Sequence, residues 1–204
     1  RARGLVVQPF KVGPDFIDPS HHSVVCGRHS RNLDPFMMGE ESVRRSFVSA
    51  CEGADIAVIE GVMGLYDGVD GGDCASTAHV ARILDAPVVL VADIKGMSRS
   101  VAALIKGYAE FDSRVRFAGV IMTKGGSEKH KAMTISDISV PLLGWIPRSD
   151  ALSVESRHLG LKMADEDGRM KDTGALIEEH CLLDDLLIAA ANTTSISTEI
   201  STPP

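Results

Sequence analysis

Residues Ile56–Gly64, with the sequence IAVIEGVMG, combine the two features that decide the fold. The run from Ile56 to Ile59 is continuously apolar and rich in β-branched residues, which is typical of a strand buried on both faces of a parallel sheet. Glu60 follows directly, and the glycines after it let a ligand approach the backbone closely. The stretch therefore predicts a parallel strand whose carboxyl end meets a ligand.

Further apolar runs of the same kind, separated by segments with apolar residues at helical spacing, extend this pattern along the chain. The alternation predicts an α/β fold with a doubly wound, mostly parallel sheet, helices on both faces and right-handed crossovers. Ligands in such folds bind beyond the carboxyl ends of the strands. The expected strands are 4–10, 56–60, 87–93, 117–123 and 141–146, and the expected helices are 40–52, 76–84, 98–111 and 172–191.

The composition of the 204 residues, 44% of them hydrophobic, is that of a soluble globular domain. The net charge of -7 argues against a nucleic-acid or anionic-membrane surface, and no apolar run approaches the roughly 20 residues of a membrane span. The four cysteines form no CxxC pair, so we expect free thiols and a cytoplasmic location. Residues 1–192 are expected to form one partial domain, and the Ser/Thr-rich residues 193–204 a disordered tail.

A second candidate ligand loop follows the first expected strand, in the sequence QPFKVGPDFIDPSHH of Gln8–His22. Prolines and a glycine stiffen this loop, which presents the carboxylates of Asp15 and Asp18 three residues apart. An aspartate here could equally cap a following helix, and Lys11 could form a surface ion pair with Asp15. The loop by itself does not decide between these interpretations.

Glu60 is harder to explain as incidental, because a carboxylate after four apolar residues is costly without a cation or a donor. A carboxylate at such a strand end is where phosphate-associated Mg²⁺ is usually held. After the fourth expected strand, Thr123 and Lys124 indicate a polar turn where a base or ribose could rest. The histidines show no metal-ligand spacing, and the side chains of the adjacent His21 and His22 are expected to diverge.

Several motifs, in this order and spacing, resemble the synthetase domain of cobyrinate a,c-diamide synthases. They are QPFKVGPDFIDPSHH, SRNLDPFMMG, VIEGVMGLYDG, APVVLVADIKGMSRS and RHLGL, and the resemblance runs from about Gly4 to about Asp165. Dethiobiotin synthetase, cobyric acid synthase and the partitioning ATPases are more distant relatives that lack the KVGPDFID and EGVMGLYDG motifs. The resemblance implies a P-loop NTPase fold of the dethiobiotin synthetase kind.

The resemblance also implies a carbon–nitrogen ligase of cobalamin biosynthesis that uses glutamine as amido donor. In that family, ATP phosphorylates the a and c acetate carboxylates of a tetrapyrrole such as cobyrinate. Ammonia, released from glutamine by a separate amidotransferase domain, then displaces the phosphate. A carboxylate is a poor acyl donor, and the acyl phosphate supplies the missing leaving group.

Carried over by position, the family's catalytic residues fall in the two acidic loops. Asp15 and Glu60 would hold Mg²⁺, directly or through water. Asp18 and Asp67 would position the acceptor and the attacking ammonia, with Tyr66 beside them. Further contacts to phosphate or substrate are expected at Lys11, Gly61 and Gly64, and contacts to the nucleotide base at Thr123 and Lys124.

The chain departs from the family pattern in three ways. The Gly-rich Walker A sequence, which carries most of the triphosphate binding, is expected before Gly4 and is not supplied by these residues, so we expect weak or no ATP binding by this chain. No cysteine sits in a G-x-C-x-G nucleophile setting, so glutamine hydrolysis is not expected here. Thr123 stands where family members commonly carry Asn for adenine recognition.

Three alternatives remain open at this stage. A sister a,c-diamide synthase that acts on nickel sirohydrochlorin carries nearly the same motifs. A partitioning-type ATPase switch has the same fold but needs a nucleotide-dependent dimer and, usually, a basic surface. The missing P-loop also leaves room for an inactive fragment. The sequence allows a homodimer but does not indicate one.

Overall fold

The computed structural model describes residues 1–149 and 173–192, which form two compact units. The first unit comprises residues 1–85, and the second comprises residues 86–149 and 173–192. The expected tail at residues 193–204 and the RHLGL motif lie outside the described residues. No helix within the described ranges is long and apolar enough to cross a membrane.

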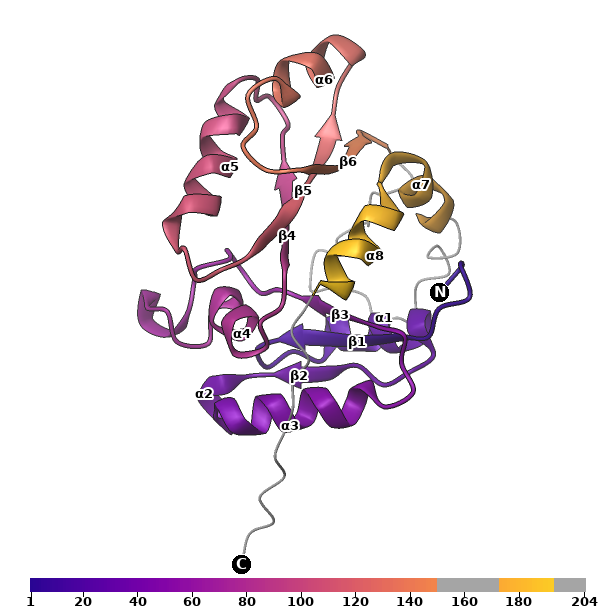
Figure 1. Ribbon diagram of the computed structural model, residues 1–204, viewed down its shortest axis with the longest axis vertical. Coiled ribbons are helices and arrows are strands. Elements are labelled where there is room, and N and C mark those ends of the chain that lie inside the picture. Colours follow the sequence, from indigo (N-terminus) through magenta and orange to yellow (C-terminus); the bar gives the residue numbers. More distant parts are fainter. Residues whose placement is uncertain (150–172, 193–204) are drawn as a thin grey trace, which may run out of the picture. The chain divides into compact units, whose positions relative to one another are not determined.

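A parallel sheet of three strands is the framework of the first unit (Figure 1). The elements of this unit are β1 (Val7–Val12), α1 (Ile17–Cys26), β2 (Arg31–Leu33), α2 (Pro35–Met38), α3 (Glu40–Cys51), β3 (Ile56–Glu60), the 3-10 helix η1 (Val69–Gly71) and α4 (Thr77–Ile83). The strand order is β2-β1-β3, and the register places Lys11 beside Glu60 and Val12 beside Leu33. The loops that follow the three parallel strands therefore leave the sheet at the same edge.

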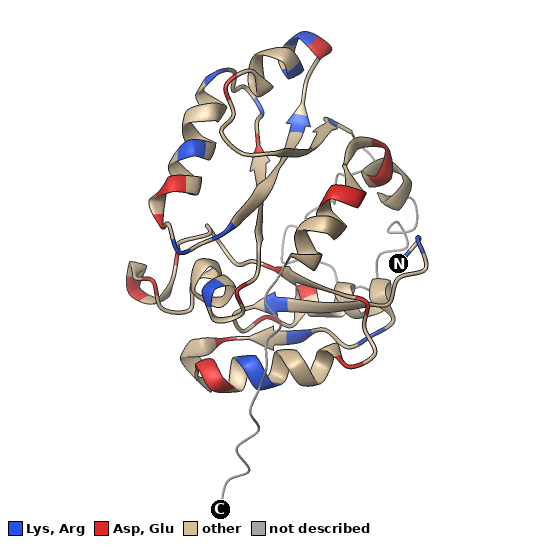
Figure 2. Cartoon of the chain, viewed as in Figure 1, with Lys and Arg blue, Asp and Glu red and all other residues tan. Residues whose placement is uncertain are grey.

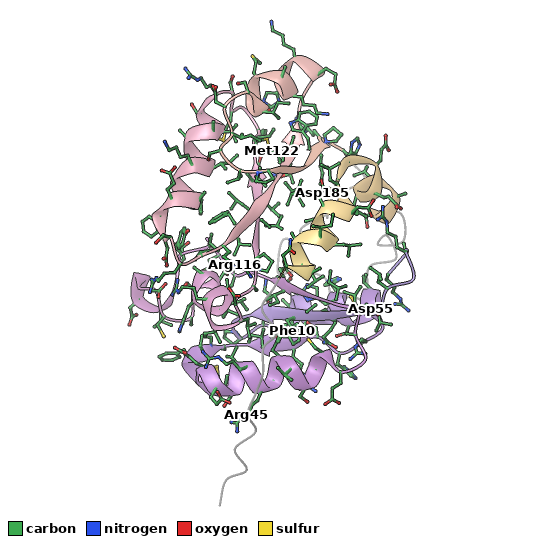
Figure 3. The ribbon with its side chains drawn as sticks, viewed as in Figure 1. Phe10, Arg45, Asp55, Arg116, Met122 and Asp185 are labelled. Atoms are coloured by element: carbon green, nitrogen blue, oxygen red, sulfur yellow. The ribbon has the colours of Figure 1, made fainter. Side chains whose placement is uncertain are left out.

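Strand β1 is buried along almost its whole length, as expected for the middle strand of a parallel sheet. The side chain of Phe10, labelled in Figure 3, is fully buried and stacks on Phe47 of α3 with ring centroids 5.0 Å apart. Such an aromatic pair contributes about 0.5–1.5 kcal/mol beyond its area burial. Val12, Leu33 and Val43 are equally buried, so the apolar core of this unit lies directly beneath the loops at the carboxyl ends of the strands.

Two local signals define the helices next to this edge. Asp34 caps α2, because its Oδ1 accepts hydrogen bonds from the N–H groups of Phe36 and Met37, and Pro35 fills the first helical position. Helix α1 ends at Gly27, whose left-handed φ of 67° closes the last turn at little steric cost.

The second unit is also built on three parallel strands. Its elements are β4 (Val88–Asp93), α5 (Ser100–Phe111), β5 (Phe117–Gly125), α6 (Glu128–Ile135), β6 (Leu142–Pro147), α7 (Thr173–His180) and α8 (Leu183–Ala191). The strand order is β4-β5-β6, and Figure 1 shows α5 and the α7–α8 pair on opposite sides of this sheet. The core contains Ile105 of α5, Val120 and Met122 of β5 (Met122 is labelled in Figure 3) and Trp145 of β6.

The structure confirms the predicted fold class of parallel strands flanked by helices, with the six strands hydrogen-bonded in two sets of three. All five predicted strands are present. The first was predicted three residues too early, because Gly4 has a φ of 83° and closes a turn on Arg1. The single helix predicted over 172–191 was wrong: the N–H of Leu182 donates to the carbonyl of Leu143 at 2.8 Å, and this contact with β6 separates α7 from α8.

Five elements were not predicted, including the 3-10 helix η1. The sequence left open whether a helix follows Asp15, because Pro19 and two aspartates lie in or beside the first turn of α1. Strand β2 is short and begins with the polar pair Arg31 and Asn32, so it carries no apolar run. Helix α2 is a single turn, and helix α6 was read as a polar turn although Ser127 caps it.

Candidate functional site

The ammonium of Lys11 lies among the carboxylates of the two acidic loops. Its Nζ is 2.7 Å from Asp18 Oδ2, 3.7 Å from Glu60 Oε1 and 4.0 Å from Asp15 Oδ2. It also donates a hydrogen bond of 3.0 Å to the carbonyl of Gly61. Lys11 is only 5% exposed, and a charge buried to that extent needs partners of opposite sign. The structure therefore brings together the three carboxylates predicted from the two loops, and a lysine holds them. We call these four side chains the Lys11 cluster.

The two aspartates of the cluster stand at the start of α1. Oδ1 of Asp15 accepts hydrogen bonds from the N–H groups of Ile17 at 2.8 Å and Asp18 at 3.4 Å, so the capping interpretation holds for this oxygen. Asn32 of β2 fixes the loop from the other side through a 2.6 Å hydrogen bond to the carbonyl of Asp15. The hydrogen bond from Lys11 holds the pKa of Asp18 below its ordinary value, so this carboxylate stays ionised.

Glu60 has a different partner on each carboxylate oxygen. Oε1 faces Lys11, and Oε2 lies 2.6 Å from Nε2 of His22 on α1. The other ring nitrogen of His22 lies 3.2 Å from Oγ of Ser30. The sequence did not indicate this role for His22. The available signal was the spacing of Asp18 and His22, which places both on one face once α1 is recognised as a helix.

Asp67 belongs to the loop after β3 but makes its contacts within that loop. Its Oδ2 accepts a hydrogen bond from the N–H of Gly64 at 2.9 Å, and its own N–H donates to the carbonyl of Gly64 at 3.1 Å. A Cβ on Gly64 would clash with Asp67 Oδ2, and one on Gly61 would lie 2.9 Å from Thr77 Oγ1. These glycines are therefore needed for the packing of the loop itself. Tyr66, which stands between Leu65 and Asp67 in the sequence, is half-buried.

Thr123 and Lys124, predicted to lie near a nucleotide base, are among the last residues of β5 in the second unit. Nζ of Lys124 lies 2.6 Å from Asp93 Oδ2, and this contact lowers the pKa of Asp93. The hydroxyl of Thr123 donates to the carbonyl of Ala92 on the neighbouring strand at 3.3 Å, so it faces β4. A hollow of about 430 Å³ beside them is lined by Lys95, Gly96, Met97, Lys124, Gly125, Gly126, His130 and Arg148.

His130 joins the two loops that border this hollow. Its Nδ1 accepts a hydrogen bond from the N–H of Gly126 at 2.8 Å, and its Nε2 lies 2.6 Å from the carbonyl of Met97. Because a carbonyl can only accept, Nε2 carries the proton. The loops after β4 and β5 are thus held together by one imidazole ring, which the sequence did not indicate.

Large apolar side chains are exposed in the loops at the carboxyl ends of the first unit's strands. Phe16 is 74% exposed after β1, Phe36 and Met37 are 65% and 72% exposed after β2, and Met63 is 77% exposed after β3. We call these four side chains the apolar rim. Large exposed apolar side chains in the segments that carry a polar site suit a ligand or partner surface.

The charged residues and the possible metal ligands of the described residues bear on which ions the site could hold. Lys and Arg are spread over both units among Asp and Glu (Figure 2). All four cysteines are free, as predicted. Within the described residues no group of three or more His, Cys, Asp and Glu could by itself hold a metal ion. Magnesium usually takes only one or two protein carboxylates together with substrate phosphates, so the Asp15 and Glu60 oxygens fit that form of site.

The comparisons with known proteins agree with this chemistry. A family model described as an AAA domain matches residues 18–156. The chain belongs to this AAA domain family. The family is of the P-loop ATPase kind, which indicates nucleotide binding. The match begins inside α1 and runs through both units, so both carry the family's features.

Within this AAA domain family, the chain is similar to named diamide synthases. It is 46% identical to the hydrogenobyrinate a,c-diamide synthase of Streptomyces coelicolor, covering 96% of this chain and 42% of that protein. It is 43% identical to the cobyrinate a,c-diamide synthase of Picrophilus torridus, covering 96% of this chain and 46% of that protein. It is 49% identical to the hydrogenobyrinate a,c-diamide synthase of Mycobacterium tuberculosis, covering 83% of this chain and 39% of that protein.

These similarities confirm the predicted resemblance to cobyrinate a,c-diamide synthases, whose names describe ligases. The printed names of the three relatives refer to cobyrinate or hydrogenobyrinate. The chain spans less than half the length of these curated relatives.

Proposed function

We propose that this chain is the nucleotide- and substrate-binding part of an ATP- and glutamine-dependent ligase that amidates the a and c acetate carboxylates of a corrinoid. The Lys11 cluster at the carboxyl ends of β1 and β3 is the observation that supports this most directly. The identity of 43–49% to the three diamide synthases supports the choice of substrate.

The cluster suits phosphoryl transfer to a carboxylate. An oxygen of the substrate carboxylate would attack the γ-phosphorus of ATP, ADP would leave, and the acyl phosphate would result. Mg²⁺ held by Asp15 and Glu60 would neutralise the charge of the transferring group. Lys11 would keep these carboxylates converged, because its ammonium contacts both.

The second half of the reaction needs ammonia beside the acyl phosphate. Its nitrogen would attack the carbonyl carbon, inorganic phosphate would leave, and the amide would form. We assign the positioning of the acceptor to Asp18 and that of ammonia to Asp67, with Tyr66 beside it. Gly61 and Gly64 let the backbone of this loop approach the phosphate. The ammonia would come from a glutamine amidotransferase domain in the longer protein.

The apolar rim suits the remaining part of the substrate. A corrin macrocycle has broad apolar faces and carries its carboxylates on flexible side chains at the periphery. Phe16 directly follows Asp15, and Met63 lies three residues beyond Glu60, so apolar contacts border the acidic residues in both loops. Ligand sites of this type combine many apolar contacts with a few polar groups that fix orientation.

The hollow beside Lys124 is the place we propose for the base of the nucleotide. The side chains of Lys95, Lys124 and Arg148 supply cations there, and Gly125 and Gly126 also line the hollow. The Thr123 hydroxyl is engaged with Ala92, so we assign base recognition to backbone groups of this turn rather than to that hydroxyl.

An amidation assay on the full-length enzyme tests the proposed function. Cobyrinate, hydrogenobyrinate and nickel sirohydrochlorin are each incubated with ATP, Mg²⁺ and glutamine, and the products are analysed by mass spectrometry. We expect a diamide from a corrinoid substrate and its loss in Asp15→Asn and Glu60→Gln. Glu110→Gln, which changes an exposed carboxylate paired with Lys106, is the matched control and should remain active. A diamide from the nickel substrate alone, or no amide at all, would exclude the proposal.

A further inference from the structure

The Glu60 carboxylate is half-exposed, yet both of its oxygens are held. Its side chain is 49% accessible and belongs to the last residue of β3, whose backbone is paired with Lys11 of β1. Lys11 holds Oε1 at 3.7 Å, which is beyond hydrogen-bond distance. His22 holds Oε2 at 2.6 Å, so the imidazole is the closer of the two partners.

Ser30 fixes the orientation of the His22 ring. An ionised carboxylate can only accept, so the proton of this contact is on Nε2 of His22. Nδ1 then accepts from the Ser30 hydroxyl, which lies 3.2 Å away. Ser30 is itself anchored, because its N–H donates to Oγ of Ser23 at 2.9 Å. A chain of hydrogen bonds thus runs from the α1–β2 connection through His22 to Glu60.

This chain of contacts is not what holds α1 in place. Arg28, just beyond the end of the helix, donates to Oε1 of Gln8 on β1 at 2.8 Å and to the carbonyl of Ala50 at 2.8 Å. Asn32 fixes the Asp15 loop independently of the imidazole. Removing the His22 ring therefore leaves the anchors of the helix and of the loop intact, and frees mainly the Glu60 carboxylate.

We propose that His22, oriented by Ser30, is a positioning residue that holds Glu60 in the rotamer needed for the reaction. This inference rests on the proposed function, in which Glu60 acts in phosphoryl transfer. Partners that orient a ligating carboxylate in this way typically contribute about 10- to 100-fold to metal affinity or activity. The carboxylate is thereby pre-organised before the substrates arrive.

Kinetics of the full-length enzyme give the first test. In His22→Phe we expect kcat to fall by about 10- to 100-fold, the Mg²⁺ concentration for half-maximal rate to rise, and KM for the corrinoid to change little. His22→Gln, whose amide can donate near the position of Nε2, should recover part of the loss. The matched control is His29→Phe, which alters an exposed imidazole beyond the end of the same helix and should be unaffected.

A second test does not depend on activity. Nitrogen-15 spectra of the imidazoles should show His22 as the Nε2-protonated tautomer, with a signal that shifts in Glu60→Ala and in Ser30→Ala. The Nδ1-protonated tautomer, or a signal indifferent to Glu60→Ala, would overturn the proposal even if His22→Phe fails to fold.

The outcomes separate this inference from the function on which it rests. Wild-type amidation that is lost in Glu60→Gln, together with unchanged kcat and Mg²⁺ dependence in His22→Phe, would remove His22 and leave the function standing. Absence of amidation in the wild type, or full activity of Glu60→Gln, would instead remove the proposed function.

Discussion

Lys11 Nζ lies 2.7 Å from Asp18 Oδ2, although Lys11 is on β1 and Asp18 is in the first turn of α1. The pair therefore closes the β1–α1 loop over a buried ammonium. It also places the carboxylate of Asp18 next to Glu60, which contacts the same ammonium. A cation that belongs to the protein thus organises the acidic residues before any ligand binds.

Replacing Lys11 by Met tests this arrangement through stability. The carboxylates would lose their common partner, and removing one partner of a charge-assisted hydrogen bond costs about 1–3 kcal/mol. The partial exposure of Asp18 and Glu60 favours the lower end of that range. Urea unfolding of Lys11→Met should show the loss. Lys106→Met, which removes an exposed ion pair with Glu110, should show no measurable change. Equal stability of the two variants would mean that Lys11 does not organise the cluster.

The same pair predicts a pH dependence of stability. Lys11 lowers the pKa of Asp18 in the folded state. Such a carboxyl stabilises the fold above its unfolded pKa, and the contribution is lost as the pH falls through the folded pKa. The stability difference between the wild type and Lys11→Met should therefore be largest above about pH 4 and shrink on acidification. Unfolding curves at a series of pH values measure it. A difference independent of pH would show that Lys11 stabilises by packing alone.

The sequence predicted five of the six strands and the edge at which the ligand residues gather, but not how those residues contact one another. Continuous apolar runs such as Ile56–Ile59 identify parallel strands, and parallel strands bring their carboxyl ends together. The predicted burial on both faces was wrong for β3, in which no residue is fully buried and Val58 is 53% exposed. The contact of Lys11 with Glu60 depends on strand register, which no local pattern encodes. The role of His22 was not predicted, because Asp18 and Pro19 stand in the first turn of its helix and the sequence left that helix open.

The contacts in the nucleotide-base region could not be predicted from the sequence either. Thr123 and Lys124 were predicted to form a polar turn after the strand, but β5 continues through Gly125 and includes both residues. Their contacts depend on the neighbouring strand: the hydroxyl of Thr123 bonds to Ala92, and Lys124 pairs with Asp93. Those partners lie about thirty residues away in sequence, beyond the range of any periodicity argument.

Gly64→Ala should disable the site without unfolding the protein. The new Cβ would clash with Asp67 Oδ2 and force open the turn that positions Asp67. We expect loss of amidation with a smaller effect on unfolding temperature, because the new Cβ meets the exposed Asp67 side chain and not the buried Leu65 of the same turn. Gly107→Ala is the control: nothing lies within 4 Å of its Cβ, and alanine stabilises a helix interior by about 0.5–1 kcal/mol. Full activity of Gly64→Ala would show that the position of Asp67 does not matter for the reaction.

The last prediction concerns the contribution of the apolar rim to substrate binding. If Phe16 and Met63 contact the corrin macrocycle, Phe16→Ser and Met63→Ser remove apolar area that only the bound substrate covers. Burying a side chain of this size is worth about 1.5–3 kcal/mol, which corresponds to roughly 10- to 100-fold in affinity. Both side chains are more than two-thirds exposed in the free protein, at 74% and 77%, so folding stability should not change.

Steady-state kinetics of the full-length enzyme measure this effect. KM for the corrinoid should rise in Phe16→Ser and Met63→Ser, while KM for ATP stays at the wild-type value, because apolar side chains offer no hydrogen-bond donor or charge to the triphosphate. Val24→Ser, which alters an apolar side chain 64% exposed on α1, is the matched control and should leave both constants unchanged. A rise in KM for ATP alone would assign the rim to the nucleotide. No change in either constant would mean that these side chains serve another partner, since a substrate resting on them would lose that apolar contact.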